Sequence, residues 1–474
     1  MSMQAGWRAA LLGACLGACS GGGNGALAQT VPQAPTNDIN AVQGVLRLRG
    51  SSALGSELVP ALAMAFGRAS GLSGVRTVQD SETQSTTLVM EGGETERTLR
   101  VEILPTNSAA AFPALVDHSA DVGMVSRAAT EAERAALQKA GVGDIAAPGN
   151  VTPVSLDGIA VLVHPSNPVS RLTLPQLRAV FGKTVTNWSA LGGPDLPISL
   201  YGSAQESGTL DMFRSLALGG GPVASSIHAG ETGADVADAV ASDPGGIGFT
   251  GLAYIRNAKP VALRLECGLE RAPTRFLVRA EEYPLSRRLV LYSPAHKTAV
   301  AQAFLRFAAS DAAAPVVEKA GFTSFTPEIA DASDRAARVQ GFALGTPDGR
   351  DARAKAAEFG AMTEGWRRVS TTFRFDFGGS ALDARARDDL GRLAAWLKRD
   401  PKRQFMLVGY ASGQGAFGAN LTLSMRRAQE VGTQLAGRGA VPARVSGMGT
   451  MGPVGCNDMN TKGGINRRVE VWVR

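Results

Sequence analysis

A strand-like run followed by a serine-containing loop and an amphipathic helix occurs three times in this sequence. In the first copy, the alternating residues Val45–Arg49 lead into Gly50-Ser51-Ser52, and apolar residues then recur at every fourth position from Leu54 to Phe66. This spacing places the apolar residues on one face of a helix. Because the strands alternate with helices, the pattern predicts an α/β fold.

The other two copies have the same order. Asp121–Val125 leads into Ser126 and Arg127, and Thr130 and Glu133 then have the spacing of a capping box for the next helix. In the third copy a polar loop ends at Ser207, Gly208 and Thr209, where a further helix begins. One such loop alone is an ordinary helix cap. Three in one unit predict a ligand cleft, because clefts of open α/β sheets lie at strand carboxyl ends and helix N-termini favour anions.

Composition excludes several other classes of protein. The chain is 44% hydrophobic and 19% charged, which is enough apolar material for ordinary cores. Its length of 474 residues corresponds to about three domains. Lys and Arg number 48 against 42 Asp and Glu, giving a mild net charge of +6 without basic runs interleaved with aromatic residues. This balance argues against a nucleic-acid groove and fits a small anionic ligand or an acidic polymer.

Residues 1–28 are typical of an export signal. Arg8 precedes the apolar run Ala9–Ala18, and Ala26-Leu27-Ala28 has the pattern of a signal-peptidase site. A second interpretation stays open, because Leu16–Cys19 resembles a bacterial lipobox in which Cys19 would become the acylated first residue. No later segment has about 20 apolar residues without charges, so we do not expect a membrane-spanning helix in the mature chain.

Cysteine usage agrees with export. Removal of the leader leaves Cys267 and Cys456, which are too few for a zinc site, and we expect neither a metal nor a cofactor. A disulfide between domains and a pair of unbridged thiols are both compatible with the sequence.

Residues 44–326 resemble periplasmic solute-binding proteins of the phosphate-binding (PstS-like) type, which have the type II periplasmic binding fold. The likeness rests on the order of several short motifs: Gly50-Ser51-Ser52, Asp121–Arg127, Leu172–Leu177, Thr186-Asn187-Trp188, Ser207-Gly208-Thr209 and Gly245–Phe249. The resemblance implies a bilobal α/β fold, with the first lobe built from both ends of the segment and the second from its middle. It places the crossovers near Pro153–Gly158 and Tyr254–Val261.

The same resemblance implies that a tetrahedral oxyanion, phosphate first, binds between the lobes. Main-chain N–H groups would hold it together with Ser51, Ser52, Ser126, Arg127, Ser207, Gly208 and Thr209. The sequence departs from the family pattern in two places. Ser203 and Ala204 stand where phosphate binders usually place Arg and Asp, and the loop Pro105–Ser108 lacks the expected glycine. The identity of the anion therefore stays open.

The C-terminal part of the chain differs in composition. Residues 327–369 are rich in Ala, Arg, Asp and Glu, which predicts a linker with some helix, and residues 370–474 predict an α+β domain of βαβαβ type. Its expected elements are a strand at Thr372–Phe377, a helix with the apolar stripe Leu382 to Leu397, a strand at Phe405–Val408, a helix at Asn420–Ala436 and a strand at Arg468–Arg474.

This domain looks like the peptidoglycan-binding domain of OmpA and Pal-type proteins. The matching motifs are Phe375–Gly378, Val408-Gly409-Tyr410, Asn420–Ala428, Gly447-Met448-Gly449 and Asn466–Val471. The resemblance implies a site at Ser412, Asn420 and Arg427, in which Arg427 meets a carboxylate of diaminopimelate. Ser412 stands where the family has an acidic residue, which leaves diaminopimelate binding in question. The alternative is that Arg427 only supports core packing.

We therefore expect a periplasmic cell-envelope binding protein without enzymatic activity. It would capture phosphate or a related oxyanion, and its OmpA-like domain would tether it to peptidoglycan or the outer membrane. An ABC transporter or an outer-membrane protein is a candidate partner, and nucleic acid is not. One alternative is a structural tether whose bilobal part binds a protein. The other, a phosphoester hydrolase, is disfavoured because no motif places a histidine base beside Ser52 or Ser207.

Overall fold

The computed structural model of the chain describes residues 42–474 except 93–95, 148, 204–207, 343–349, 376–377, 381, 383, 414 and 458–463. The predicted leader with Cys19 lies outside the described residues, and so do Ala204 and Ser207 of the third loop.

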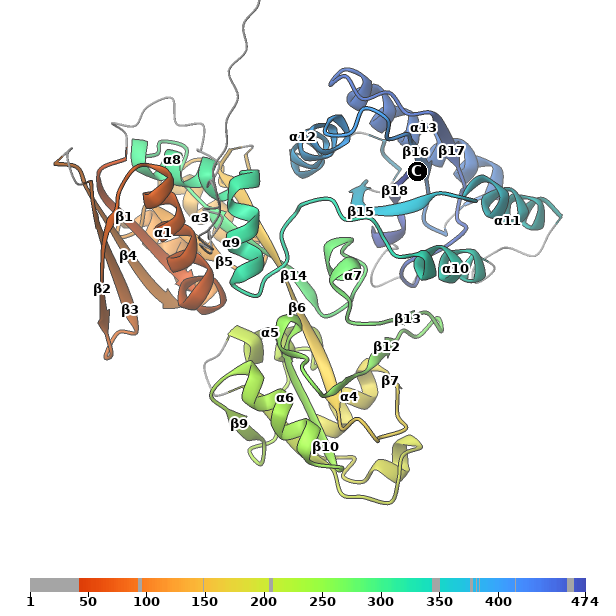
Figure 1. The fold of residues 1–474 in the computed structure, drawn as a ribbon, viewed down its shortest axis with the longest axis horizontal. Coiled ribbons are helices and arrows are strands. Elements are labelled where there is room, and N and C mark those ends of the chain that lie inside the picture. Colours follow the sequence, from red (N-terminus) through yellow and green to blue (C-terminus); the bar gives the residue numbers. More distant parts are fainter. Residues whose placement is uncertain are drawn as a thin grey trace, which may run out of the picture. The chain divides into compact units, whose positions relative to one another are not determined.

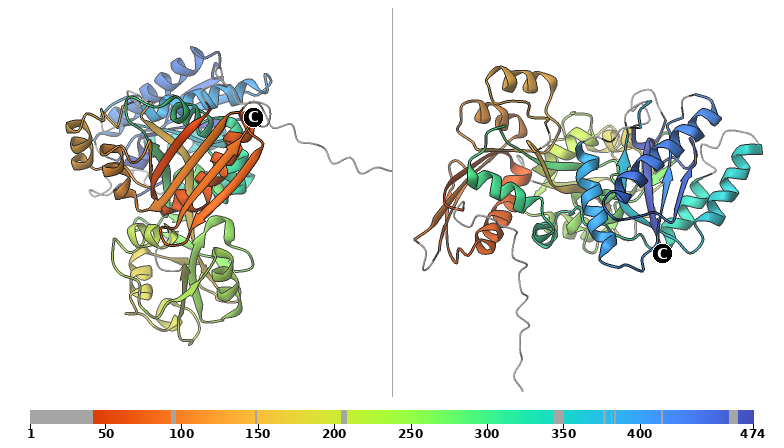
Figure 2. Two further views of the ribbon diagram at one scale, coloured as in Figure 1. Left: turned by 90° about the vertical axis from the view of Figure 1, so that its left-hand side faces the viewer. Right: turned by 90° about the horizontal axis from the view of Figure 1, so that it is seen from above.

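The first lobe is a sheet covered by helices on both faces (Figures 1 and 2). Its strands are ordered β2-β3-β4-β1-β5-β14-β6. They span Gly44–Ser51 (β1), Gly74–Asp80 (β2), Ser85–Glu91 (β3), Thr98–Thr106 (β4), Val122–Val125 (β5), Val151–Val163 (β6) and Ser286–Tyr292 (β14). The helices are α1 (Val59–Ala69), α2 (Ala111–Val116), α3 (Glu131–Lys139), α8 (Ala299–Ala308) and α9 (Ala314–Lys319), and a π-helical turn at Leu54–Leu58 precedes α1.

Alternation along the strands explains the two covered faces. Leu289 and Leu291 of β14 pack in one apolar cluster with α1 and α8, while Val290 packs in another with α2 and α3. Successive side chains of a strand point to opposite faces, so a strand that is apolar throughout is buried on both. The predicted helical stripe is buried as well, at Leu54, Leu58, Leu62 and Phe66.

The second lobe repeats this architecture on a smaller scale. Its strands are β8 (Ser199–Ser203), β9 (His228–Gly230), β10 (Gly246–Gly251) and β11 (Lys259–Pro260), which are joined by the end of β6. Its helices are α4 (Leu174–Phe181), α5 (Gly208–Leu216), α6 (Gly233–Ser242) and α7 (Arg275–Arg279), and a small sheet is formed by β7 (Arg171–Leu172), β12 (Ala262–Arg264) and β13 (Glu270–Arg271). Phe181, Phe213 and Phe249 form the aromatic centre of its core.

Strand β6 connects the two lobes. Its residues 151–158 pair with β14 in the first lobe, and its residues 159–163 pair with β10 in the second. The first crossover therefore lies at the end of the predicted Pro153–Gly158 segment. The second crossover was predicted wrongly at Tyr254–Val261. The chain returns only at Ser286, because Val261, Val278 and Leu285 still pack in the core of the second lobe.

The C-terminal domain has a four-stranded sheet in the order β15-β18-β16-β17. Its elements are β15 (Arg367–Arg374), α12 (Ala384–Lys398), β16 (Phe405–Gly409), α13 (Phe417–Ala436), β17 (Arg444–Gly447) and β18 (Arg468–Val473). This arrangement is the expected α+β fold. None of the described helices combines the length and apolar character that crossing a bilayer requires.

The segment 327–369 contains two helices, α10 (Ala332–Gly341) and α11 (Arg350–Met362). Phe359 and Phe342 stack with ring centroids 4.2 Å apart, and both lie in one buried cluster with residues of the C-terminal sheet: Met406, Val408, Tyr410 and Trp472. The segment that we predicted as a linker thus extends the core of the C-terminal domain by its packing.

A disulfide joins Cys267, between β12 and β13, to Cys456, between β17 and β18. Of the two possibilities that the sequence left open, the structure has the bonded pair. Arg271 adds a second link here, since its Nε donates to the carbonyl oxygen of Val454 at 3.1 Å.

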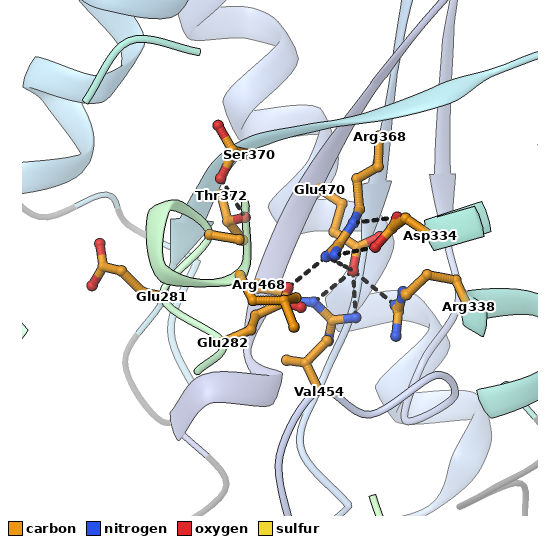
Figure 3. Close-up of polar contacts among 12 residues, drawn as sticks. Glu281, Glu282, Asp334, Arg338, Arg368, Ser370, Thr372, Val454, Arg468 and Glu470 are labelled. Atoms are coloured by element: carbon orange, nitrogen blue, oxygen red, sulfur yellow. Dashed lines mark hydrogen bonds and ion pairs between the residues drawn. The ribbon is translucent and has the colours of Figure 1, made fainter. Parts of the chain in front are cut away.

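A buried group of charges, here called the junction cluster, gathers around Arg368 and Glu470 (Figure 3). Arg368 of β15 forms ion pairs with Glu282 at 2.5 Å and with Asp334 of α10 at 2.8 Å. Glu470 of β18 binds the guanidinium groups of Arg338 at 2.8 Å and Arg468 at 2.6 Å. The cluster therefore connects the second lobe, the helix α10 and the C-terminal sheet.

The arginines keep the buried carboxylates of the junction cluster ionised. Burial alone would raise the pKa of Glu282, but the positive charges of Arg368 and Arg271 outweigh burial and hold this pKa at about 2. Glu470 is likewise buried, and Arg338 and Arg468 hold its pKa well below the usual range. Inside the protein, the arginines stabilise the ionised form of the carboxylates, and the carboxylates stabilise the charge of the arginines.

Candidate functional site

The carboxyl ends of β1 and β5 bring two of the predicted loops together. The strands are parallel neighbours, with Gly50 opposite Met124, so Ser51 and Ser126 follow at the same edge of the sheet. Gly50 has φ +131°, and a Cβ atom there would lie 2.2 Å from the carbonyl oxygen of Met124. Only glycine therefore allows this turn. Ser51 is buried at the end of β1.

Ser126 is held by hydrogen bonds from two directions. Its backbone N–H donates to the Ser108 Oγ at 3.0 Å, and the two hydroxyl oxygens are 2.9 Å apart. From β14, the neighbouring antiparallel strand, the Arg287 Nη1 donates to the Ser126 Oγ at 3.1 Å. The hydroxyl of Ser126 is thus oriented at the end of β5.

Arg287 makes contacts with both lobes. It belongs to β14 and is 13% exposed. Its Nη2 donates to the carbonyl oxygen of Gly208 at 2.9 Å and to Asp157 Oδ2 at 3.3 Å. Its Nε is buried without a hydrogen-bond partner among the described residues. One guanidinium therefore contacts the end of β5, the connecting strand β6 and the start of α5.

The start of α5 also touches the first loop directly. A Cβ atom on Gly208 would lie 2.6 Å from the Cβ of Ala53, which follows Ser52. Only glycine permits this approach of the lobes. Thr209 is half-buried in the first turn of α5, while Ser207 lies outside the described residues. Ser52, Ser126 and Gly208 are in this way brought into one region between the lobes.

Two carboxylates lie in the same region. Burial raises the pKa of Asp157, and the positive charge of Arg287 opposes this shift. Burial also raises the pKa of Glu57, in the turn before α1, with a further contribution from the charge of Asp157. The negative charges of Asp157 and Glu57 therefore repel each other. Asp157 and Arg287 are largely buried, whereas Glu57 is exposed.

Arg127 is directed elsewhere. Its guanidinium forms a bidentate pair with Glu133, at 2.6 and 2.8 Å, and lies 5.5 Å from the ring centre of Phe112. Glu133 also completes the capping box with Thr130 that the sequence predicted for α3. The hydrogen bond from Arg127 is the main reason that the pKa of Glu133 falls to about 2. The structure thus brings Arg287, rather than Arg127, to Ser126 and Gly208.

Sequence reasoning missed Arg287. The signal that could have found it is the pair Arg287-Arg288 at the start of the otherwise apolar strand Leu289-Val290-Leu291. A charged residue in a strand that is buried on both faces needs a partner. Nothing in the sequence indicates which segments supply that partner.

The predicted residues of the C-terminal domain lie on and beside α13. Asn420, Ser424 and Arg427 are buried on one face of this helix, and Ser412 is buried in the loop after β16. Arg427 donates from Nε to the carbonyl oxygen of Gly379 at 2.9 Å and from Nη1 to that of Tyr410 at 3.3 Å. Burial, with a smaller contribution from Arg467, lowers the pKa of Arg427 to about 10. Arg427 thus ties two loops to the helix.

Comparison with known proteins identifies both parts of the chain. Residues 68–312 match the family model of the PBP superfamily domain, and residues 374–467 match that of the OmpA family. The chain belongs to the PBP superfamily and carries a C-terminal OmpA family domain.

Two curated relatives and one solved structure illustrate the likeness. The phosphate-binding protein PstS of Pseudomonas aeruginosa is 29% identical over 293 residues, which are 56% of this chain and 88% of the relative. Protein SphX of Synechococcus elongatus is 29% identical over 169 residues, 34% of this chain and 49% of the relative. The crystal structure of an ABC-type phosphate transport receptor from Vibrio cholerae is 22% identical, with a TM-score of 0.45 over 58% of this chain and 98% of that one.

Proposed function

We propose that this protein captures phosphate, or a closely related oxyanion, in the region between its lobes. The observation that carries the proposal is the position of Arg287, whose guanidinium reaches Ser126 from one lobe and Gly208 from the other. The likeness to phosphate-binding proteins of the PstS type supports phosphate as the first ligand to test. The ligand groups would be Ser51, Ser52, Ser126, Ser207, Gly208 and Thr209 with Arg287.

The number of groups is sufficient for useful affinity. A hydrogen bond to a charged acceptor contributes about 1.5 to 3 kcal/mol, and micromolar affinity corresponds to about 8 kcal/mol. Four hydrogen bonds near the upper end of this range, about 12 kcal/mol together, would leave a margin for the ordering cost of closure. In this proposal Arg287 supplies, from β14, the guanidinium that phosphate binders usually place near Ser203 of the third loop.

Titration calorimetry on the full-length protein tests the ligand. We expect orthophosphate to bind with a Kd of roughly micromolar magnitude, and sulfate and arsenate titrations rank the related anions. If none of these anions produces heat or raises the melting temperature, the bilobal part does not capture oxyanions.

We further propose that the OmpA family domain holds the protein to peptidoglycan through the Arg427 region. A guanidinium fork matches a carboxylate in a bidentate way, and the carboxylate of diaminopimelate would be its partner. The carbonyl contacts of Arg427 with Gly379 and Tyr410 set the direction of the side chain. Ser412 offers a neutral acceptor in place of an acidic residue, which costs on the order of 1 kcal/mol in binding.

The substitution Arg427→Ala should remove most co-sedimentation of the full-length protein with purified peptidoglycan sacculi. The adjacent Arg426 is exposed and provides a matched control, because Arg426→Ala removes the same charge from the same helix. Near-UV circular dichroism checks that both variants are folded. Equal sedimentation of the wild type and a folded Arg427→Ala variant would remove the proposed role.

These activities together suggest a binding protein of the periplasm or cell wall that performs no catalysis. Delivery of the anion to an ABC transporter, or attachment to an outer-membrane protein, follows as a proposal about partners. Lipid attachment at Cys19 remains part of the same proposal, and mass spectrometry of the membrane fraction tests it.

A further inference from the structure

A groove of about 770 Å³ is lined by residues of both the first lobe and the C-terminal domain. The first lobe contributes the turn before β6, Lys297 in the loop before α8, and Arg306 of α8. From the C-terminal domain come Arg387 and Arg392 of α12 and Arg438, which follows α13. The groove is separate from the region around Arg287, and its lining contains none of the predicted ligand residues.

The charge of this lining is strongly positive. Five of its described residues are Lys or Arg, and Asp388 is the one carboxylate among them. The ammonium of Lys297 bonds a neutral acceptor, the Asn150 Oδ1, at 2.7 Å. Arg306 and Arg387 are exposed and make no hydrogen bond or ion pair with any residue that the structure describes. Arg392 pairs with Asp389 at 2.9 Å, so the uncompensated positive charges of the groove include those of Lys297 and Arg306 from the first lobe and Arg387 from the C-terminal domain.

The titration of one lining group points the same way. Burial lowers the pKa of Lys297, so the charged form of this ammonium group lacks a sufficient counter-charge. An anion in the groove would supply that counter-charge.

The same two parts are joined by a largely buried ion pair between Arg288 and Asp389 at 3.6 Å, but the ion pair at the surface is weak. Arg399 pairs with Asp311, but the two side chains are 56% and 60% exposed. Exposed pairs contribute little to stability. An anion that contacts Arg306 and Arg387 at once would add a connection that these surface charges do not provide.

We propose that the groove is a second anion site, which binds a linear ligand made of several linked phosphate groups. Arginine forks bind phosphate oxygens in a bidentate way, and cations on both walls favour a ligand with more than one anionic group. The volume of the groove also exceeds that of a single phosphate several times, since one water takes about 30 Å³. This site is independent of the proposed cleft function.

Calorimetry with sodium tripolyphosphate on the full-length protein tests the second site, with saturating orthophosphate present throughout to occupy the cleft. We expect tripolyphosphate to bind the wild type. The double variant Arg306→Gln/Arg387→Gln should weaken this binding about tenfold or more, because it removes two charged donors. Both side chains are exposed, so the variant should keep its fold.

A matched double variant separates a site from general surface charge. Arg68→Gln/Arg76→Gln removes the same charge from exposed residues of the first lobe that do not line the groove, and it should bind tripolyphosphate as the wild type does. An Arg287→Met variant should also retain tripolyphosphate binding if the two sites are independent. The proposal is overturned by a wild type that does not bind tripolyphosphate, by unchanged affinity of Arg306→Gln/Arg387→Gln, or by an equal loss in the Arg68→Gln/Arg76→Gln control.

Discussion

Replacing Arg368 by methionine should lower the free energy of unfolding by about 3–5 kcal/mol, because removing one partner of a buried ion pair leaves an uncompensated charge. Arg368 is 1% exposed and pairs with Glu282 and Asp334, and Glu282 is 1% exposed. Methionine keeps much of the side-chain volume, so the loss reports the charge more than the packing. Chemical denaturation followed by tryptophan fluorescence measures it.

Two controls test this explanation. The neighbouring substitution Arg367→Met removes the same charge from an exposed side chain. It should lower the free energy of unfolding by about 1 kcal/mol or less, because only the hydrogen bonding of Arg367 to the carbonyl oxygen of Ala330 is lost. The double variant Arg368→Met/Glu282→Gln should recover part of the loss, since it removes the unpaired carboxylate. Equal destabilisation by Arg368→Met and Arg367→Met would contradict a special role of the junction cluster.

The pH dependence of Arg368→Met distinguishes charge from packing. In the wild type the pKa of Glu282 is held at about 2, below its unfolded value, so its stabilising effect is complete above pH about 4.5 and is lost as the pH falls toward 2. In Arg368→Met the carboxylate can take up a proton earlier, which relieves its cost. The stability difference between the two proteins should therefore shrink as the pH falls from 4.5 toward 2.

The substitution Arg287→Met should weaken phosphate binding by about a hundredfold or more. Arg287 is the guanidinium that contacts both Ser126 and Gly208, and two charged hydrogen bonds correspond to about 3 kcal/mol or more. Its loss would also leave the negative charge of Asp157 facing the anion without compensation. Calorimetry with orthophosphate measures the affinity.

Arg127→Met is the informative comparison for this variant. The guanidinium of Arg127 is occupied by Glu133, so its removal should leave phosphate affinity nearly unchanged. Because Arg287→Met unbalances the largely buried Asp157, the variant Arg287→Met/Asp157→Asn provides a folded alternative if the single variant is unstable. Loss of binding in Arg127→Met with retention in Arg287→Met would restore the ligand set that the sequence predicted.

Local patterns account for the parts of the fold that could be predicted. The stripe from Leu54 to Phe66, the capping box of Thr130 and Glu133, and the shared face of Asn420, Ser424 and Arg427 all depend on residues within a few turns of one another. The bilobal α/β fold and the C-terminal α+β fold were predicted from such patterns together with family motifs, and both are confirmed.

Features that depend on distant segments could not be predicted. The role of Arg287 exists only because β14 lies between β5 and β6 in the sheet, which no local pattern indicates. The bond between Cys267 and Cys456 spans 189 residues and stayed open for the same reason. The late second crossover was missed because the short strands β12 and β13 give little periodicity, although they belong to the second lobe.

The place of β14 in the first-lobe sheet sets an order of events during biosynthesis. This strand pairs with both β5 and β6, so the first lobe lacks an interior strand until residue 292 has been made. Contacts between segments so far apart in sequence form slowly, because a long loop must close first. The sheet of the first lobe therefore stays incomplete until the whole second lobe has been synthesised.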